Sequence, residues 1–166
     1  LNVTDTAGCK ASDTIHFEPA PILNFTKAIT NVLCNGGNTG GIEILIDTFA
    51  APYTFTWVDG NSSNPRNNLA VGNYRLTITD RFGCTVADSS TVTQPSVLNV
   101  TSTINQVACS IDNTGAIQLN VSGGVAPYQF LWSNSAATPS ISGLNGGNYS
   151  VTVTDNNSCT FVRNIV

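Results

Sequence analysis

The stretch that decides the fold occurs twice, as residues 69–79, Leu-Ala-Val-Gly-Asn-Tyr-Arg-Leu-Thr-Ile-Thr, and as residues 144–154, Leu-Asn-Gly-Gly-Asn-Tyr-Ser-Val-Thr-Val-Thr. After the tyrosine, apolar residues alternate with polar ones, which is the pattern of a strand with one buried face. The Leu-x-x-Gly-x-Tyr form before it is that of a tyrosine corner at the start of strand F. The stretch therefore predicts an all-β fold of tandem immunoglobulin-like or fibronectin-like antiparallel β-sandwich domains.

Two more segments upstream of each copy alternate with period 2: residues 42–46 and 53–57, and their counterparts 117–121 and 128–132. The second segment ends in a tryptophan at the position of the core tryptophan of strand C. We assign four aromatic side chains to the structural core rather than to a ligand: Trp57, Trp132, Tyr74 and Tyr149. No segment of useful length has a helical period.

A long internal repeat organises the chain. One constant offset relates Cys34 to Cys109, and it also relates the turn that ends at Cys9 to those that end at Cys84 and Cys159. A period this long suits a small independent domain in a tandem array. We expect three segments: 1–20 as the C-terminal strands of a preceding repeat, 21–95 as one sandwich repeat, and 96–166 as a second, nearly complete one. The chain is thus expected to be a fragment of a larger protein.

The composition argues against several classes of function. Only 10% of the residues are charged, the formal net charge is −4, and Thr, Asn and Ser supply most of the polar side chains. Six scattered basic residues do not make a nucleic-acid surface, and no apolar run is long enough for a membrane span. The single histidine, His16, has no partner cluster, and no Ser/His/Asp arrangement, paired carboxylate or phosphate loop can be assembled. We therefore expect no catalytic residues, no enzyme activity and no cofactor.

Three blocks in succession resemble the SprB-type repeat. They are Cys-x(4)-Thr-Gly from Cys109, Gly-Gly-x-x-Pro-Tyr-x-Phe-x-Trp over residues 123–132, and Leu-x-x-Gly-x-Tyr-x-Val-x-Val-x-Asp-x-x-x-Cys-Thr over residues 144–160. Residues 34–91 follow the same pattern, with Thr48-Phe49 in place of the two glycines.

This resemblance implies a repeat from a very large surface adhesin of gliding Bacteroidota, exported by type IX secretion and moved by the gliding motor. It implies an extracellular, cell-surface stalk that supports attachment and gliding, with adjacent repeats and surface polysaccharide as partners. The alternative is a carbohydrate-binding module, or an accessory domain of a secreted polysaccharide-acting protein. In that case the loops beside Trp57 and Trp132 would stack on sugar, which requires exposed rings.

Each repeat carries two cysteines, which in an extracellular chain suggests disulfides. In a sandwich, Cys34 follows strand A and Cys84 lies in the turn between strands F and G, at opposite ends roughly 25 Å apart. A disulfide needs Cα atoms within about 7 Å. We therefore favour Cys34 with Cys159 across a head-to-tail junction. The alternative is pairing within each repeat, Cys34 with Cys84 and Cys109 with Cys159, and free thiols are the third possibility.

Two weaker sites complete the predictions. Asp80 and Asp155 each end strand F, where an aspartate commonly caps a turn, and calcium at a domain junction is the functional alternative. Thr6 and Thr14 lie in Asp-Thr-Ala and Asp-Thr-Ile, which resemble a short O-glycosylation motif of Bacteroidota.

Overall fold

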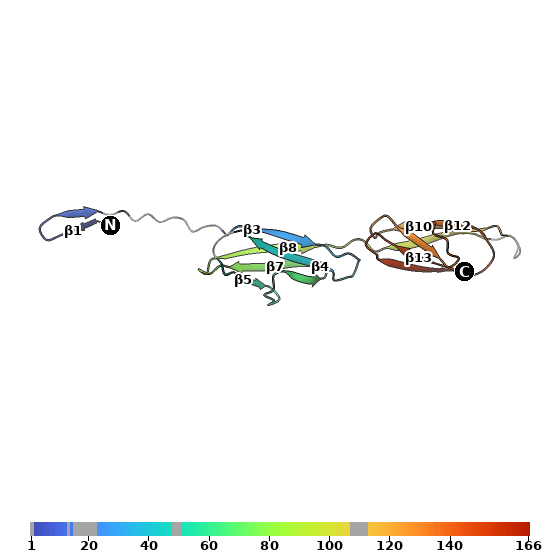
Figure 1. Cartoon of the computed structure of the whole chain (residues 1–166), viewed down its shortest axis with the longest axis horizontal. Helices are drawn as coiled ribbons and strands as arrows, with labels where there is room; N and C mark the ends of the chain where they lie inside the picture. The colour runs from blue at the N-terminus through green and yellow to red at the C-terminus, as the bar shows by residue number, and fades with distance from the viewer. Residues whose placement is uncertain (1, 13, 15–22, 48–50, 107–112) are drawn as a thin grey trace.

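The computed structural model describes residues 2–12, 14, 23–47, 51–106 and 113–166. All of the regular secondary structure within these residues is β-strand (Figure 1). The strands are β1 (Asn2–Thr4), β2 (Lys10–Ser12), β3 (Phe25–Thr30), β4 (Gly40–Ile46), β5 (Thr54–Trp57), β6 (Arg66–Leu69), β7 (Gly72–Thr79), β8 (Thr85–Val92), β9 (Asn99–Asn105), β10 (Gly115–Ser122), β11 (Gln129–Trp132), β12 (Ser140–Leu144), β13 (Tyr149–Thr154) and β14 (Thr160–Ile165).

Strands β3 to β8 form the first sandwich. One sheet has the order β3-β4-β6 and the other β5-β7-β8, all antiparallel. In immunoglobulin-like nomenclature these are sheets A-B-E and C-F-G. The alternation along β4 buries Ile42 and Ile44 between the sheets, where they meet Trp57, Leu76 and Ile78 from the facing sheet.

Strands β9 to β14 form the second sandwich in the same way, with sheets β12-β10-β9 and β11-β13-β14. Its core uses the equivalent positions, including Ile117, Leu119, Trp132, Val151 and Val153. The two sandwiches have the same strand order and equivalent core positions, because the apolar residues recur at the same spacing in both repeats. The structure therefore confirms the predicted all-β, immunoglobulin-like sandwich class.

The predicted tyrosine corners form in both sandwiches. The Tyr74 hydroxyl donates to the Ala70 carbonyl at 3.0 Å, and the Tyr149 hydroxyl donates to the Asn145 carbonyl at 3.1 Å. Each bond ties the start of strand F to the loop just upstream, which is the contact that defines a tyrosine corner in immunoglobulin-like domains. Both tyrosine rings pack against the core of their own sandwich.

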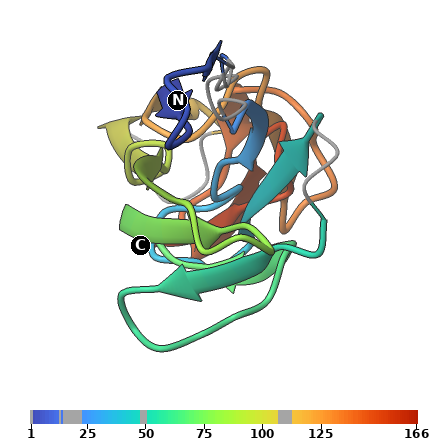
Figure 2. The same cartoon turned by 90° about the vertical axis from the view of Figure 1, so that its left-hand side faces the viewer.

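The two sandwiches lie end to end along the long axis of the molecule (Figure 1), and the view down that axis places one behind the other (Figure 2). The end of the first sandwich that carries the β3–β4 loop meets the end of the second that carries the β13–β14 turn. Strands β1 and β2 pair as a separate two-stranded sheet, from Asn2 with Ser12 to Thr4 with Lys10.

Candidate functional site: the junction between the sandwiches

A disulfide joins the two sandwiches. Cys34, in the β3–β4 loop of the first, is bonded to Cys159, in the β13–β14 turn of the second, with Cα atoms 5.7 Å apart. The sequence separation of the two cysteines is 125 residues. In the chain-entropy model, closing a loop of that size costs the unfolded chain about 5 kcal/mol of conformational freedom at 25 °C, which stabilises the folded chain.

The turn that presents Cys159 is built by Asp155. Its Oδ1 accepts the backbone N–H groups of Asn157, at 2.8 Å, and of Cys159, at 2.9 Å. Its Oδ2 accepts the N–H of Val125 at 2.9 Å. The Asp155 side chain is buried, and burial opposes its ionisation, but the N–H groups of Cys159, Val125 and Asn157 outweigh that cost and hold the pKa of Asp155 below its usual value.

Within the described residues the same turn occurs three times. Asp80 Oδ1 accepts the N–H groups of Phe82 and Cys84 at 2.8 and 2.9 Å, and Asp5 Oδ1 accepts those of Ala7 and Cys9, both at 2.9 Å. The residue before each cysteine has a positive φ: 85° at Gly8 and Gly83, and 66° at Ser158. Cys84 and Cys9 therefore occupy the same position in this turn as Cys159 does, and both are exposed.

Hydrogen bonds between the first sandwich and the linker reinforce the disulfide. The Val32 N–H donates to the Thr93 carbonyl at 2.9 Å, and Asn31 Oδ1 accepts the Thr93 N–H at 2.9 Å. Gln94 Oε1 accepts the Gly36 N–H at 2.8 Å. The linker that follows β8 is therefore held by the same β3–β4 loop that carries Cys34.

The second sandwich holds the other end of the linker. The Gly124 N–H donates to the Ser96 carbonyl at 2.9 Å. Gly123 has a φ of 71°, and a Cβ atom there would overlap the Val97 carbonyl oxygen. The turn between β10 and β11 can approach the linker only because this residue is glycine.

One contact bridges the sandwiches directly beside the disulfide. Asn157 Nδ2 donates to the Leu33 carbonyl at 2.9 Å. Leu33 and Asn157 come from the two loops that carry the bonded cysteines. The junction is thus covalent at one point and hydrogen-bonded beside it.

The structure pairs Cys34 with Cys159, which corrects the alternative of pairing within each repeat. Cys84 is free and exposed at the opposite end of the first sandwich, so it cannot reach Cys34, and the sulfur of Cys159 is already used. Cys9 is also free and exposed. Cys109 and His16 lie outside the described residues.

Both tryptophans are buried: Trp57 is 1% exposed and Trp132 is 2% exposed. Their Nε1 groups donate to the carbonyls of Ser63 and Thr138, at 3.0 and 2.9 Å. Neither ring can stack on a sugar, because both side chains are buried and Arg66 lies over the Trp57 ring. The carbohydrate-binding alternative therefore loses the two rings on which it relied.

The other predicted sites are placed as follows. The described residues contain no group of three or more His, Cys, Asp or Glu side chains that could hold a metal ion, and Asp80 and Asp155 are each engaged by backbone N–H groups. Thr6 and Thr14 are exposed. In the part of the chain that the structure describes, no helix is long and apolar enough to cross a membrane.

Three amide side chains at the junction are not evident from the sequence as functional residues: Asn31, Gln94 and Asn157. Gln94 precedes the linker proline, and Asn157 stands two positions before a cysteine. These two amides are therefore close to residues that the sequence already marks as part of a junction. A polar amide beside a predicted junction is the feature that could have marked them.

Comparisons with known proteins find similarity both in sequence and in shape. Among the solved structures, "Structure of amphioxus IgVJ-C2 molecule" has a TM-score of 0.36 and 14% sequence identity, and the match covers 84% of this chain and 94% of that one. No curated protein matches the chain. The family model described as SprB repeat matches residues 26–62 and residues 101–137, each of which runs from the first strand of a sandwich into the loop after the third. These two matches fall at equivalent positions in the two sandwiches, so each sandwich contains a segment that is similar to the SprB repeat.

Proposed function

We propose that this chain is a segment of a large secreted cell-surface adhesin, in which repeats joined end to end form a stiff extracellular stalk for surface attachment and gliding motility. The observation that carries the proposal is the disulfide from Cys34 of one repeat to Cys159 of the next. Disulfides form and persist in oxidising, extracellular environments. The resemblance to SprB-type repeats supports the finer parts of the proposal, which are type IX export, carriage by the gliding motor and contact with surface polysaccharide.

The disulfide changes how tension would pass through the chain. A pulling force that enters before Cys34 and leaves after Cys159 crosses the disulfide directly. The residues between the two cysteines then lie outside the covalent path of the load. At about 3.4 Å per extended residue, the 125-residue separation corresponds to roughly 400 Å of chain that cannot be drawn out while the disulfide is intact.

The strands that remain in the path are well placed to resist tension. β3 leads to Cys34 and β14 leads away from Cys159, and both run along the long axis of the molecule. β3 pairs with β4 from Phe25–Ile46 to Thr30–Gly41, and β14 pairs with β13 from Thr160–Thr154 to Ile165–Tyr149. While the disulfide is intact, β4 and β13 lie outside the covalent path, so the load runs along β3 and β14 themselves, and these strands are already extended and can lengthen little.

The free cysteines fit the same scheme. Cys84 lies in a turn that matches the Cys159 turn bond for bond. In the proposed stalk, Cys84 receives the Cys34-type cysteine of another repeat, and the bridge recurs at every junction. The role is mechanical: the proposal assigns the segment no reaction and no cofactor, and it needs no calcium at Asp80 or Asp155.

Single-molecule pulling tests the proposal. The chain is held by peptide tags at its two ends, so that Cys9 and Cys84 are not used for attachment. The oxidised protein should release only short lengths, and adding a reductant should release roughly 400 Å more. Cys34→Ser should behave as the reduced protein does in both conditions, and Cys84→Ser should behave as the wild type. Equal total lengths with and without reductant would overturn the load-bearing role.

A further inference from the structure

A four-residue sequence, Asn-Gly-Gly-Asn, occurs twice in the chain, at residues 35–38 and at residues 145–148. An asparagine followed by glycine is prone to spontaneous deamidation, because no side chain on the glycine hinders its backbone nitrogen from approaching the asparagine side chain. The two copies continue with the same residues, so their intrinsic reactivity is closely similar. What differs between them is the structure that surrounds them.

The first copy lies in the β3–β4 loop, directly after the bonded cysteine. The Gly37 N–H donates to the Cys34 carbonyl at 3.0 Å, and Gly36 has a φ of 76°. Residues 34–37 thus form a β-turn whose third position has a positive φ, which glycine adopts readily. Asn35 and Gly36 are both exposed, so water has access to this turn.

The linker holds both of the groups that would have to react. Asn35 Nδ2, the leaving group of a deamidation, donates to the Pro95 carbonyl at 2.9 Å. The Gly36 N–H, whose nitrogen is the nucleophile, donates to Gln94 Oε1 at 2.8 Å. A base has to remove the proton of this N–H before the nitrogen can attack, and Gln94 covers that proton. The seated linker therefore opposes the reaction at both ends.

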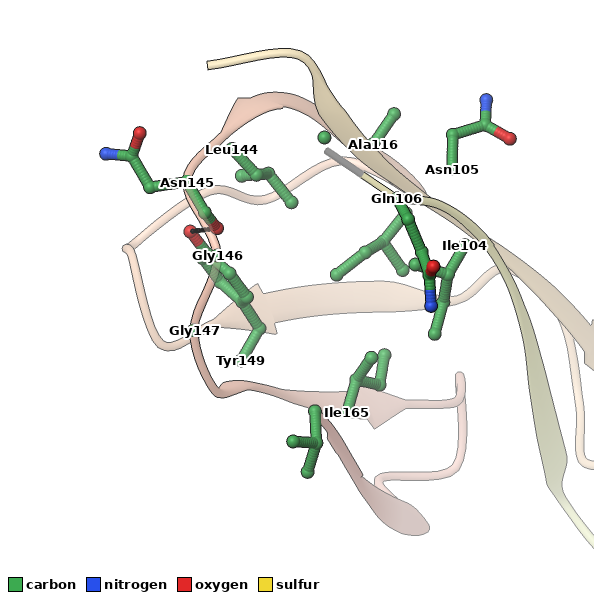
Figure 3. Close-up of a pocket in the computed structure, with 13 residues that line it drawn as sticks. Ile104, Asn105, Gln106, Ala116, Leu144, Asn145, Gly146, Gly147, Tyr149 and Ile165 are labelled. Atoms are coloured by element: carbon green, nitrogen blue, oxygen red, sulfur yellow. Dashed lines mark hydrogen bonds between the residues drawn. The ribbon is translucent and has the colours of Figure 1, made fainter. Parts of the chain in front are cut away.

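The second copy lies in the β12–β13 loop and is not held in this way. The Asn145 carbonyl accepts the Tyr149 hydroxyl, and the Asn145 side chain points away from the cavity that Figure 3 shows beside this loop. Within the described residues, neither Asn145 Nδ2 nor the Gly146 N–H makes a hydrogen bond, and both residues are exposed. The same tetrapeptide therefore occurs once with its reacting groups held and once with them open to water.

We propose that Asn35 is a modification site whose deamidation is controlled by the linker between the two repeats. While the linker is seated, its two hydrogen bonds keep Asn35 intact. When the linker leaves the β3–β4 loop, the Gly36 nitrogen attacks Cγ of Asn35, the Cγ–Nδ2 bond breaks, and the amide leaves as ammonia with the proton that Gly36 loses. One water molecule then opens the cyclic imide to aspartate or isoaspartate, so the reaction consumes no other reagent.

The conversion prevents the linker from returning to its place. A carboxylate at position 35 has no proton to donate to the Pro95 carbonyl and sets a negative charge against that oxygen. The isoaspartate product also adds a methylene group to the backbone before Gly36, which displaces the Gly36 N–H from Gln94. Neither product alters the disulfide of Cys34. A junction that has stayed open long enough is therefore left with its covalent bond but without these linker contacts.

The test follows deamidation at Asn35 and Asn145 in the same molecule. The oxidised chain is incubated at neutral pH, digested, and mapped by mass spectrometry, which separates the aspartate and isoaspartate products from the unmodified peptides. Asn35 should convert at least about tenfold more slowly than Asn145, because two hydrogen bonds have to break first. In the chain unfolded by guanidinium chloride the two sites should convert at similar rates, because the tetrapeptides are identical.

A variant of the linker separates its effect from that of the turn. Gln94→Ala removes one of the two contacts and should speed the conversion of Asn35 by about fivefold, whereas Asn145 should keep its rate. Similar rates at Asn35 and Asn145 in the folded wild type would overturn the proposal. An unchanged rate at Asn35 in Gln94→Ala, or an equal rise at both asparagines, would do the same. The experiment applies no force, so its outcome is independent of whether the junction bears load.

Discussion

The turns at Asp80 and Asp155 have the same backbone hydrogen bonds but different surroundings. In the second repeat, Asp155 also accepts the Val125 N–H, is buried, and presents a cysteine that is bonded to the neighbouring sandwich. In the first repeat, Asp80 is half-buried and presents Cys84, which is free and exposed. The local sequence is therefore enough to build the turn, whereas the neighbouring sandwich decides whether its cysteine is bonded.

The largest expected effect comes from removing the bonded cysteine. Cys34→Ser should lower the free energy of unfolding by up to about 5 kcal/mol, because the unfolded chain regains the freedom of the closed loop. Urea unfolding of the oxidised protein measures it. Cys84→Ser is the control and should stay within about 0.5 kcal/mol of the wild type, as expected for an exposed free thiol. If the two variants lost similar free energies of unfolding, the Cys34–Cys159 disulfide would not be the source of the stabilisation.

Glycine substitutions compare crowding with backbone strain. Gly123 and Gly83 both have positive φ, 71° and 85°, but only at Gly123 would a Cβ atom overlap a backbone oxygen, whereas Gly83 has nothing within 4 Å. Gly123→Ala should cost more than about 3 kcal/mol, and Gly83→Ala about 1–2 kcal/mol. Thermal unfolding compares them. If Gly83→Ala is the more damaging, the linker does not press on the β10–β11 turn as described.

The third comparison replaces each aspartate with asparagine. Asp155→Asn should cost about 2 kcal/mol, because an amide cannot accept at both Oδ1 and Oδ2, and one of the buried N–H groups loses its partner. Asp80→Asn should cost under about 1 kcal/mol, since only Oδ1 receives the two turn N–H groups, and the amide oxygen can replace it. Chemical unfolding at pH 7 measures both.

The same pair of variants gives a pH dependence. The pKa of Asp155 is held below its usual value in the folded chain, so its contribution to stability is present above the unfolded pKa of about 3.9 and is lost as the pH falls through the lower folded value. Wild-type stability should therefore fall more steeply than that of Asp155→Asn below about pH 4. Parallel curves would show that the buried carboxylate gains nothing from its three donors.

The smallest effect is expected where the two repeats use different chemistry for one position. Arg66 pairs with Asp59, with Nη2 2.6 Å from Oδ2, and lies over the Trp57 and Tyr74 rings at 5.1 and 5.3 Å. Its counterpart is Ile141, which is buried in the second core. Arg66→Ile should move the thermal midpoint by less than about 4 °C, because an apolar side chain can replace a partly exposed ion pair at little cost. A larger fall would show that the Arg66 contacts contribute more than the buried isoleucine does.

The sequence predicts the sandwiches well because the alternation of apolar residues and the tyrosine corner are local patterns that recur in each repeat. The end-to-end placement of Cys34 and Cys159 could also be reasoned from strand length and the reach of a disulfide. The contacts of Gln94, Asn31 and Asn157 could not, since each depends on how a linker lies in space. The burial of Asp155 depends likewise on the Val125 N–H, which comes from a different loop.

The central claim is that a covalent bond ties one repeat to the next, and disulfide mapping of the unreduced protein tests it most directly. Proteolysis with free thiols blocked, followed by mass spectrometry, should yield a peptide that contains Cys34 joined to one that contains Cys159, and Cys84 should carry the blocking group. A peptide that joins Cys34 to Cys84, or one that joins Cys109 to Cys159, would contradict the account.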